Sequence, residues 1–514
     1  MKLATSDMIR KIDNLAESDL GIPVTELMRR AGVAVASAVR ELTRPGGRVI
    51  VLSGTGNNGG DGYAAACELM GEYRVAVVDV LGIPPKTPAA APFVAEYTAR
   101  GGEKITLTFD GTIEDAISSA DTVVDAIFGT GVRPDSSVEI SHLAELVRSA
   151  AKVRKVAVDL PLGVNPDDGS IIDFAVTVDT TVALSYIKPG LLSFPARTLT
   201  GRIVLDRLGI DTEITDAAFE FKNYFTDADL ARSLLPSRPE NSNKGSFGKA
   251  LVITGSEKYR GAAHLSLEAA LRGGAGLVAY LGIPSLADEL TMKYPEAIYL
   301  REDVENCQSE GGVSRILDIS TSYSSILIGS GSSPSPALYR LVEAMILTEG
   351  APVVLDADAI NSIAAYGDGT ADILKRAKRA VILTPHPLEF ARLSGKSVTE
   401  VQAGRLNIAR KFAYDHNCIL LLKGAATVVT DGNITYLNGT GSSALAKAGS
   451  GDVLAGLLVS ILAQGVDPLA ATALAAYLHG AAGDGLAECY SHYGVTPSDL
   501  PREIAKVIAS LAKK

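Results

Sequence analysis

The segment from Lys447 to Gly456 joins a glycine-rich turn to one carboxylate at the start of an apolar run. Gly449 and Gly451 let an anion approach backbone N–H groups, and a helix beginning beside them directs its positive end at that anion. Asp452 then lies where a substrate hydroxyl can lose its proton. Standing alone, the segment is also typical of a small-residue turn before a buried helix. Together with the motifs elsewhere in the chain, it favours phosphoryl chemistry.

Other apolar runs in the second half of the chain also end in polar residues. Lys423 is followed by glycine and threonine, which can offer backbone and hydroxyl groups to a nucleotide, although the ammonium can also simply be solvated. His386 stands between two prolines that hold it stiffly, yet a strand-end histidine is often only packed or exposed. Asp356 and Asp358 share a face if the backbone is extended. A role as a helix cap is an equally good interpretation for one of them.

In the first half, the segment from Gly54 to Gly62 holds a dense set of glycines directly after an apolar run. We interpret it as a glycine-rich loop that forms an anion-binding nest, with a flexible turn as the alternative. The segment lacks the G-x-G-x-x-G spacing and the later acidic residue of a Rossmann dinucleotide site. It is therefore not predicted to be one.

Two further apolar runs in the first half end in Asp125 and Asp159. Open α/β sheets bind ligands beyond the carboxyl ends of their strands, so the topology brings these two acids together. Each suits a helix cap, a metal ligand or an acid–base group, and the sequence leaves the three roles open. Carboxylates with an asparagine carbonyl would suit a hard cation.

The elements that must position these residues alternate between apolar runs and helix-compatible stretches, which predicts parallel, doubly wound α/β sheets. Apolar residues at helical spacing predict a helix from Val24 to Leu42. The predicted strands are 48–53, 75–81, 122–127, 155–160 and 180–184, followed by 249–254, 326–328, 353–355, 380–383 and 419–422.

The chain has 514 residues, more than the roughly 250 to 300 at which a single core stops growing. An acidic, irregular stretch near 208–238 precedes a fresh strand, so we place a domain boundary near 222 and predict α/β domains over 1–222 and 223–514. The net charge of −11 and the absence of a basic run argue against a general nucleic-acid binder.

The four cysteines are scattered without C-x-x-C spacing, which indicates neither a zinc site nor a disulfide framework and favours a reducing cytoplasm. The first residues lack the apolar core of a signal peptide, and the longest apolar run, from Val453 to Val466, is too short to span a bilayer. We expect a cytoplasmic protein without a membrane partner.

Three motifs of the first half occur in the order found in NAD(P)H-hydrate epimerases, after a helical opening from Leu27 to Gly32: Asn57 to Gly62, Asp125 to Gly131, and Asp159-x-Pro161-x-Gly163. The first domain resembles that family, with a Rossmann-like sheet. The resemblance implies that Asp159 acts in acid–base catalysis. It also implies contacts to the hydrated nicotinamide nucleotide from Asn57, Asn58, Gly59, Gly60, Asp61, Gly129, Thr130, Gly131, Val132, Arg133 and Asp159.

The same resemblance implies a potassium ion held by Asn58 and Asp125. The family usually has a serine in its D-x-P-S-G motif, and this chain has Leu162 at that position, so a hydroxyl ligand is missing. Backbone carbonyls are the available substitutes.

The second half, about residues 224 to 510, resembles the ribokinase-like superfamily and, more closely, the ADP-dependent NAD(P)H-hydrate dehydratases. The resemblance implies that Asp452 meets the reacting hydroxyl. It implies contacts to the hydrated dinucleotide from Ala262, Gly331, His386 and Asp452, and contacts to the adenine nucleotide from Lys423, Gly424, Ala425, Ala426, Thr427 and Gly451. Asn243 departs from this pattern, because it stands where the family often has histidine.

The two resemblances together imply a fused repair enzyme. Its first domain would interconvert the R and S hydrates of NADH and NADPH, termed NADHX and NADPHX. Its second domain would dehydrate the S form with ADP as co-substrate and release AMP and phosphate. Magnesium is expected at the phosphates, no nucleic acid is expected as a partner, and we expect a homo-oligomer.

The competing hypothesis is a small-molecule kinase of the ribokinase superfamily with a non-catalytic, nucleotide-binding first domain. The Gly-Ser-Gly-Asp turn serves phosphorylation of a hydroxyl equally well. The epimerase-like first domain argues against the kinase, since it specifies a different substrate.

Overall fold

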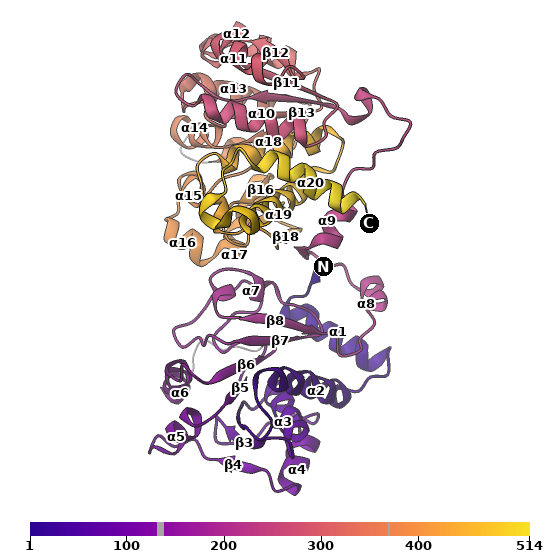
Figure 1. The fold of residues 1–514 in the computed structure, drawn as a ribbon, viewed down its shortest axis with the longest axis vertical. Coiled ribbons are helices and arrows are strands. Elements are labelled where there is room, and N and C mark those ends of the chain that lie inside the picture. The colour runs from indigo at the N-terminus through magenta and orange to yellow at the C-terminus, as the bar shows by residue number, and fades with distance from the viewer. Residues whose placement is uncertain (131–137, 368–370, 514) are drawn as a thin grey trace. The chain divides into compact units, whose positions relative to one another are not determined.

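The computed structural model describes residues 1–130, 138–367 and 371–513 (Figure 1). Residue contacts divide the chain into two compact units. The N-terminal unit is Lys2–Phe221, and the C-terminal unit is Lys222–Lys514 with Met1. Among the described residues, no helix has the length and apolar character needed to cross a membrane.

The N-terminal unit alternates strands and helices along the chain. Its elements are β1 (Lys2–Leu3), α1 (Ser6–Ser18), α2 (Val24–Leu42), β2 (Arg48–Ser53), α3 (Asn57–Leu69), β3 (Arg74–Asp79), α4 (Ala91–Ala99), β4 (Glu103–Ile105), α5 (Thr112–Ser118), β5 (Thr122–Ala126), α6 (Val138–Ser149), β6 (Arg154–Val158), β7 (Thr180–Leu184), α7 (Pro189–Leu192), η1 (Ala196–Thr198), β8 (Arg202–Asp206) and α8 (Thr212–Ala218).

The sheet of this unit has the order β4-β3-β2-β5-β6-β7-β8 and is parallel throughout. Ile50 and Leu52 belong to a core cluster with residues of α5 and α6, whereas α2 and α3 pack on the other face, so both faces are covered (Figure 1). This arrangement explains why the strands are almost continuously apolar. The chain order reverses between β2 and β5, and the carboxyl ends of strands at such a switch point form a ligand crevice.

The glycine-rich segment from Gly54 to Gly62 differs from the predicted loop. Only its first residues form a loop, because α3 already begins at Asn57. A side chain at Gly59 would overlap the carbonyl of Gly54, and one at Gly62 would lie 2.6 Å from the Cβ of Ala126. The glycines therefore serve close packing of a helix against the strand ends.

The C-terminal unit is also α/β. Its elements are β9 (Asn223–Thr226), α9 (Ala228–Leu234), η2 (Lys244–Phe247), β10 (Lys249–Ile253), α10 (Arg260–Arg272), β11 (Leu277–Gly282), α11 (Pro284–Lys293), β12 (Ile298–Arg301), η3 (Val304–Gln308), α12 (Glu310–Ser320), β13 (Ser325–Ile328), α13 (Pro336–Leu347), β14 (Val353–Leu355), α14 (Asp358–Tyr366), η4 (Asp372–Arg376), β15 (Val381–Leu383), α15 (Pro387–Ser394), α16 (Val398–Ala403), α17 (Arg405–His416), β16 (Ile419–Leu422), β17 (Val428–Thr430), β18 (Thr435–Asn438), η5 (Ser443–Leu445), α18 (Ser450–Ala463), α19 (Pro468–Gly494) and α20 (Leu500–Ala512).

The sheet of the C-terminal unit runs in the order β9-β18-β17-β16-β15-β14-β13-β10-β11-β12. It is parallel except that β17 is antiparallel to both β16 and β18. Helix α18 is buried on all sides from Val453 to Ala463 and packs closely on α10, since a side chain at Gly456 would overlap the backbone of Ser266. This central helix fixes its own N-terminal turn beside the carboxyl ends of β14 and β16.

Candidate active sites

A cavity of about 770 Å³ lies within the N-terminal unit at the carboxyl edge of its sheet. Helices α1 and α2 form part of its wall, and the ends of β2, β5, β6 and β7 form the rest. Of the predicted substrate contacts, those that line it are Asn57, Asn58, Asp61, Gly129, Thr130 and Asp159. Gly59 and Gly60 are buried, and Gly131, Val132 and Arg133 lie outside the described residues.

Asp159 is held in the cavity wall by a buried ion pair with Lys188. Its backbone has a φ of 65°, a left-handed conformation that non-glycine residues adopt only when the surroundings impose it. The N–H of Leu184 donates to Asp159 Oδ1 at 3.1 Å, and Lys188 Nζ also donates to the carbonyl of Leu184 at 2.9 Å. The side chain of Lys188 is 1% exposed and that of Asp159 is 10% exposed, so the carboxylate is the partner that faces the cavity.

Two more carboxyl groups share this cavity, and the environment raises the pKa of each. Burial raises the pKa of Asp13 to about 6, with the charge of Lys188 opposing the shift and that of Asp159 adding to it. Burial also raises the pKa of Asp61 well above its ordinary value, and the charges of Asp159 and Asp13 add to this effect. The site thus combines one carboxylate paired with an ammonium and two carboxyl groups that hold protons more tightly than usual.

Asp125 and Asn58, the predicted potassium ligands, are both buried near this cavity. Asp125 accepts from the N–H groups of Leu162 at 2.6 Å and Ile127 at 3.3 Å, and burial nevertheless raises its pKa to about 6. The side-chain nitrogen of Asn58 is buried without a hydrogen-bond partner among the described residues. A buried carboxylate and an amide oxygen are donor types that fit a hard cation, whereas the amide nitrogen of Asn58 is a hydrogen-bond donor and is not a ligand. Leu162 contributes only its backbone, because its side chain packs in the apolar core.

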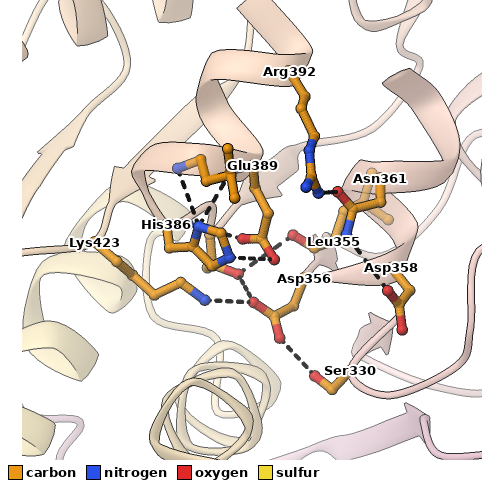
Figure 2. Close-up of polar contacts among 11 residues, drawn as sticks. Ser330, Leu355, Asp356, Asp358, Asn361, His386, Glu389, Arg392 and Lys423 are labelled. Atoms are coloured by element: carbon orange, nitrogen blue, oxygen red, sulfur yellow. Dashed lines mark hydrogen bonds and ion pairs between the residues drawn. The ribbon is translucent and has the colours of Figure 1, made fainter. Parts of the chain in front are cut away.

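In the C-terminal unit, Lys423 and Asp356 form a buried ion pair just beyond the ends of β16 and β14 (Figure 2). Lys423 Nζ donates to Asp356 Oδ1 at 3.0 Å, and the hydroxyls of Thr384 and Ser330 donate to the same carboxylate at 2.7 and 2.8 Å. Burial disfavours the charge of Lys423, but Asp356 and Glu389 outweigh burial and raise its pKa. Here the carboxylate is 1% exposed and the lysine 19% exposed, so the ammonium faces outward.

The predicted phosphate-binding turn lies beside this ammonium. Gly449 has a φ of 98° and caps α18, and a side chain at Gly451 would lie 3.0 Å from Lys423 Nζ. Asp452 is in the first turn of α18. Burial and the charge of Asp356 raise the pKa of Asp452 to about 7, while Lys423 acts in the opposite direction. A carboxyl group with a pKa near neutrality suits a general base, next to a cation and a helix N-terminus that suit a phosphate.

His386 caps α15 and is held by a reciprocal set of bonds with Glu389. Its Nδ1 accepts from the N–H groups of Leu388 and Glu389 at 3.2 Å, and its Nε2 lies 3.3 Å from Glu389 Oε1. Burial and the charge of Lys423 lower the pKa of His386, and burial raises the pKa of Glu389. Figure 2 shows both side chains converging with Lys423 on Asp356, while half of the histidine stays exposed.

The remaining predicted contacts of the C-terminal unit lie at neighbouring strand ends. Gly331 follows β13, and Ala262 lies in the first turn of α10. The two are in direct contact, because a side chain at Gly331 would lie 2.5 Å from the Cβ of Ala262. Gly424, Ala425, Ala426 and Thr427 connect β16 to β17. The Thr427 hydroxyl donates to the carbonyl of Gly424 at 2.9 Å.

Asp358 departs from the geometry expected from its spacing. Ala357 has a φ of 46°, so Asp356 and Asp358 do not follow each other in an extended strand. Asp358 instead begins α14 and accepts from the N–H of Ser333 at 3.0 Å. Only Asp356 joins Lys423.

Sequence reasoning missed Lys188, Asp13 and His479. His479 is buried on α19 and its Nε2 lies 3.1 Å from the hydroxyl of Ser450, at the start of α18. Burial lowers the pKa of His479 to about 4, so the ring is neutral. A signal for Lys188 was its position shortly after the apolar run 180–184, because strand ends collect functional residues in parallel sheets. Asp13 and His479 lie inside helices and carry no comparable signal.

A solved structure shares the fold of the C-terminal unit. A ribokinase-like superfamily protein from Enterococcus faecalis is 24% identical with a TM-score of 0.50, over 58% of this chain and 99% of that chain. The family model for NAD(P)H-hydrate dehydratase matches residues 250–506, and that for the YjeF-related protein N-terminus matches residues 24–190.

Full-length relatives identify the family. The bifunctional NAD(P)H-hydrate repair enzyme Nnr of Moorella thermoacetica is 34% identical over 100% of this chain and 98% of that protein. The enzyme of the same name from Escherichia coli is 31% identical over 98% of this chain and 93% of its own length. The ADP/ATP-dependent NAD(P)H-hydrate dehydratase of Bacillus subtilis, co-crystallised with ATP/Mg²⁺, is 30% identical with a TM-score of 0.50, over 56% of this chain and 98% of that chain. The chain belongs to the family of bifunctional NAD(P)H-hydrate repair enzymes.

Proposed function

We propose that this protein repairs hydrated nicotinamide cofactors at two separate sites. The N-terminal unit interconverts the R and S hydrates of NADH and NADPH, and the C-terminal unit dehydrates the S hydrate with ADP. The observation that carries the proposal is the arrangement at α18, where Asp452 lies beside the Gly449–Gly451 turn and the outward-facing Lys423. The full-length relatives support the choice of substrate.

The dehydration begins with proton removal by Asp452, whose pKa of about 7 lets it accept a proton at neutral pH. The hydroxyl oxygen of the hydrate attacks the terminal phosphoryl group of ADP, and AMP leaves. The phosphate then leaves the ring carbon while the neighbouring ring carbon loses a proton, which restores the reduced nicotinamide. The N–H groups of the turn and the ammonium of Lys423 stabilise the charge that develops on the phosphoryl oxygens.

In this proposal the nucleotide and the hydrate bind at neighbouring strand ends of the C-terminal unit. Residues Lys423 to Thr427 and Gly451 contact the adenine nucleotide, and Ala262, Gly331 and His386 contact the hydrated dinucleotide. Magnesium would neutralise the phosphates. Among the described residues no three histidine, cysteine or acidic side chains gather into a metal cage, which suits an ion carried mainly by phosphate oxygens and water.

Epimerisation occurs in the 770 Å³ cavity with Asp159 as an acid–base residue. The predicted set from Asn57 to Asp61 and from Gly129 to Arg133 contacts the hydrate, and Asn58 and Asp125 hold potassium. The buried charge of Asp125 supports the cation, which would supply electrostatic stabilisation near the substrate. We also propose that the protein is a cytoplasmic homo-oligomer. Native mass spectrometry of the full chain tests the oligomeric state.

The test supplies separate R and S hydrates with ADP or ATP and follows the absorbance of the reduced nicotinamide. We expect recovery from both epimers with ADP, and from R faster than its spontaneous epimerisation. Asp452→Asn should lower recovery from the S hydrate by about 100-fold or more, because a general base is removed. Asp415→Asn, which removes an exposed carboxylate of the same unit, is the matched control. Near-normal turnover in Asp452→Asn, or a stable phosphorylated product, would contradict the proposal.

A further inference from the structure

Asp13 lines the N-terminal cavity with a carboxyl group that has no partner, and it lies on a different wall of the cavity from Asp159. Asp159 follows β6 at the edge of the sheet, whereas Asp13 is on α1. Asp159 is engaged by Lys188 and by the N–H of Leu184, but Asp13 has neither a hydrogen bond nor an ion pair to any described residue. A partly buried carboxyl group without a partner is costly, so its retention in a cavity calls for a role.

The charged and titratable side chains that line the cavity are those of Arg10, Asp13, Asp61, Asp159 and Lys188. Lys188 keeps one negative charge on Asp159, and that charge adds to burial in raising the pKa of Asp13 to about 6. Burial also raises the pKa of Asp61, which favours its protonated form as a hydrogen-bond donor. Asp13 can both release and accept a proton near neutral pH, while Asp159 is paired with the ammonium of Lys188. Two neighbouring carboxyl groups in different environments are a recurrent basis for acid–base pairs.

We propose that Asp13 is the second catalytic acid–base residue of the epimerase site and works with Asp159. The inference rests on the proposed epimerase function of this cavity. In the hydrate, the hydroxyl is on a ring carbon bonded to the ring nitrogen. Asp159 takes the hydroxyl proton, the oxygen electron pair forms a carbonyl, and the carbon–nitrogen bond breaks. The electron pair of that bond stays on nitrogen, which takes the proton of Asp13.

Rotation of the free carbonyl carbon presents its other face to the nitrogen. The nitrogen attacks that face and returns its proton to Asp13, while Asp159 returns its proton to the oxygen. The ring closes with the opposite hand, and no other reactant is consumed. The residue on α1 therefore handles the nitrogen proton, and the residue at the sheet edge handles the oxygen proton.

The test uses the full chain and measures interconversion of pure R hydrate by chiral chromatography without nucleotide. Asp13→Asn should lower kcat by about 100-fold or more with a smaller change in KM, because one acid–base group is lost. Glu17→Gln removes an exposed carboxylate one turn further along α1 and should leave the rate unchanged. The wild-type rate should fall as pH rises through about 6, because the proton of Asp13 is needed. The pH–rate profile of Asp13→Asn should lack this decrease.

Turnover of S hydrate with ADP by the same Asp13→Asn protein should stay at the wild-type level, which shows that the C-terminal unit is folded, and an unchanged circular dichroism spectrum checks the fold of the whole chain. In Asp13→Ala, added formate should restore part of the epimerisation rate, a response that a structural role would not give. An Asp13→Asn protein that epimerises within about twofold of wild type overturns the inference while leaving the proposed function intact. A wild-type protein that does not accelerate epimerisation overturns the proposed function of the cavity itself.

Discussion

Both units bury a lysine–aspartate pair at the carboxyl edge of a parallel sheet, but the two pairs face opposite ways. In the N-terminal unit Lys188 is hidden at 1% exposure and Asp159 faces the cavity. In the C-terminal unit Asp356 is hidden at 1% exposure and Lys423 faces outward. In the proposed function, the first site therefore offers a carboxylate for proton transfer and the second offers a cation for phosphate. The orientation of a buried ion pair, not its presence, separates the two chemistries.

The largest expected effect comes from removing the cation of each pair in turn. Lys423→Met should weaken ADP binding by about 10- to 100-fold, because a charged hydrogen bond is worth about 1.5–3 kcal/mol. Lys188→Met should leave ADP affinity unchanged. It should instead abolish epimerisation. Each of the two substitutions should also destabilise its own unit by about 3–5 kcal/mol, since each leaves a buried carboxylate alone. Calorimetric titration with ADP and chiral analysis of the hydrates measure the two outcomes.

Lys423→Arg and Lys188→Arg keep the charge and serve as controls for the pair of methionine variants. The comparison fails if Lys188→Met and Lys423→Met weaken ADP binding equally. It also fails if Lys423→Met binds ADP as tightly as the wild type does.

A second expected effect concerns acid stability of the phosphate-binding turn. The folded state keeps His479 neutral down to about pH 4, whereas the unfolded chain protonates it near 6.5. The stability due to neutral His479 is therefore present above pH 6.5 and is lost as pH falls toward 4, by about 3 kcal/mol. Hydrogen exchange of the α18 and α19 amides, compared between wild type and His479→Gln at pH 7.5 and 4.5, measures this loss. An equal pH response in both proteins would show that His479 is charged or solvated in the folded state.

The smallest expected effect tests the proposed potassium ion of the N-terminal site. Potassium should stabilise the N-terminal unit by about 1–3 kcal/mol when it is in 10- to 100-fold excess over its Kd. Sodium should act more weakly, and Asp125→Asn should remove the potassium response. Thermal unfolding in chloride salts of equal ionic strength measures it, with the exposed Asp173→Asn as control. Identical melting temperatures of the wild type in both salts would contradict the proposed potassium site.

Sequence patterns predicted most of the framework, because apolar periodicity reports directly on burial. Helix α2 runs from Val24 to Leu42 as predicted, and each predicted strand is present within a few residues. The strands that were not predicted are β1, β4, β8, β9, β11, β12, β17 and β18. Among them β12 is short and partly exposed at the sheet edge, so it lacks a strong apolar run. The helical start at Asn57 was missed because the glycines that suggest a loop are required by packing against distant backbone.

The sites were predictable only as far as they consist of contiguous motifs. Lys423 and Asp159 end or follow apolar runs and Asp452 precedes one, and all three were predicted from that position. Lys188 acquires its role from a contact across 29 positions, and Asp13 from the placement of a whole helix over the cavity. Such relations depend on tertiary structure, and single-sequence spacing does not encode them.

The most direct test of two separate sites is complementation between variants that each disable one of them. Asp159→Asn keeps an oxygen for Lys188 and Leu184, and Asp452→Asn keeps the start of α18, so both substitutions are conservative. Each variant alone should recover NADH from pure R hydrate and ADP no faster than spontaneous epimerisation allows. A mixture of the two proteins should restore rapid recovery, because S hydrate made by one diffuses to the other. A mixture as slow as the separate variants, or rapid recovery by Asp159→Asn alone, would contradict the account.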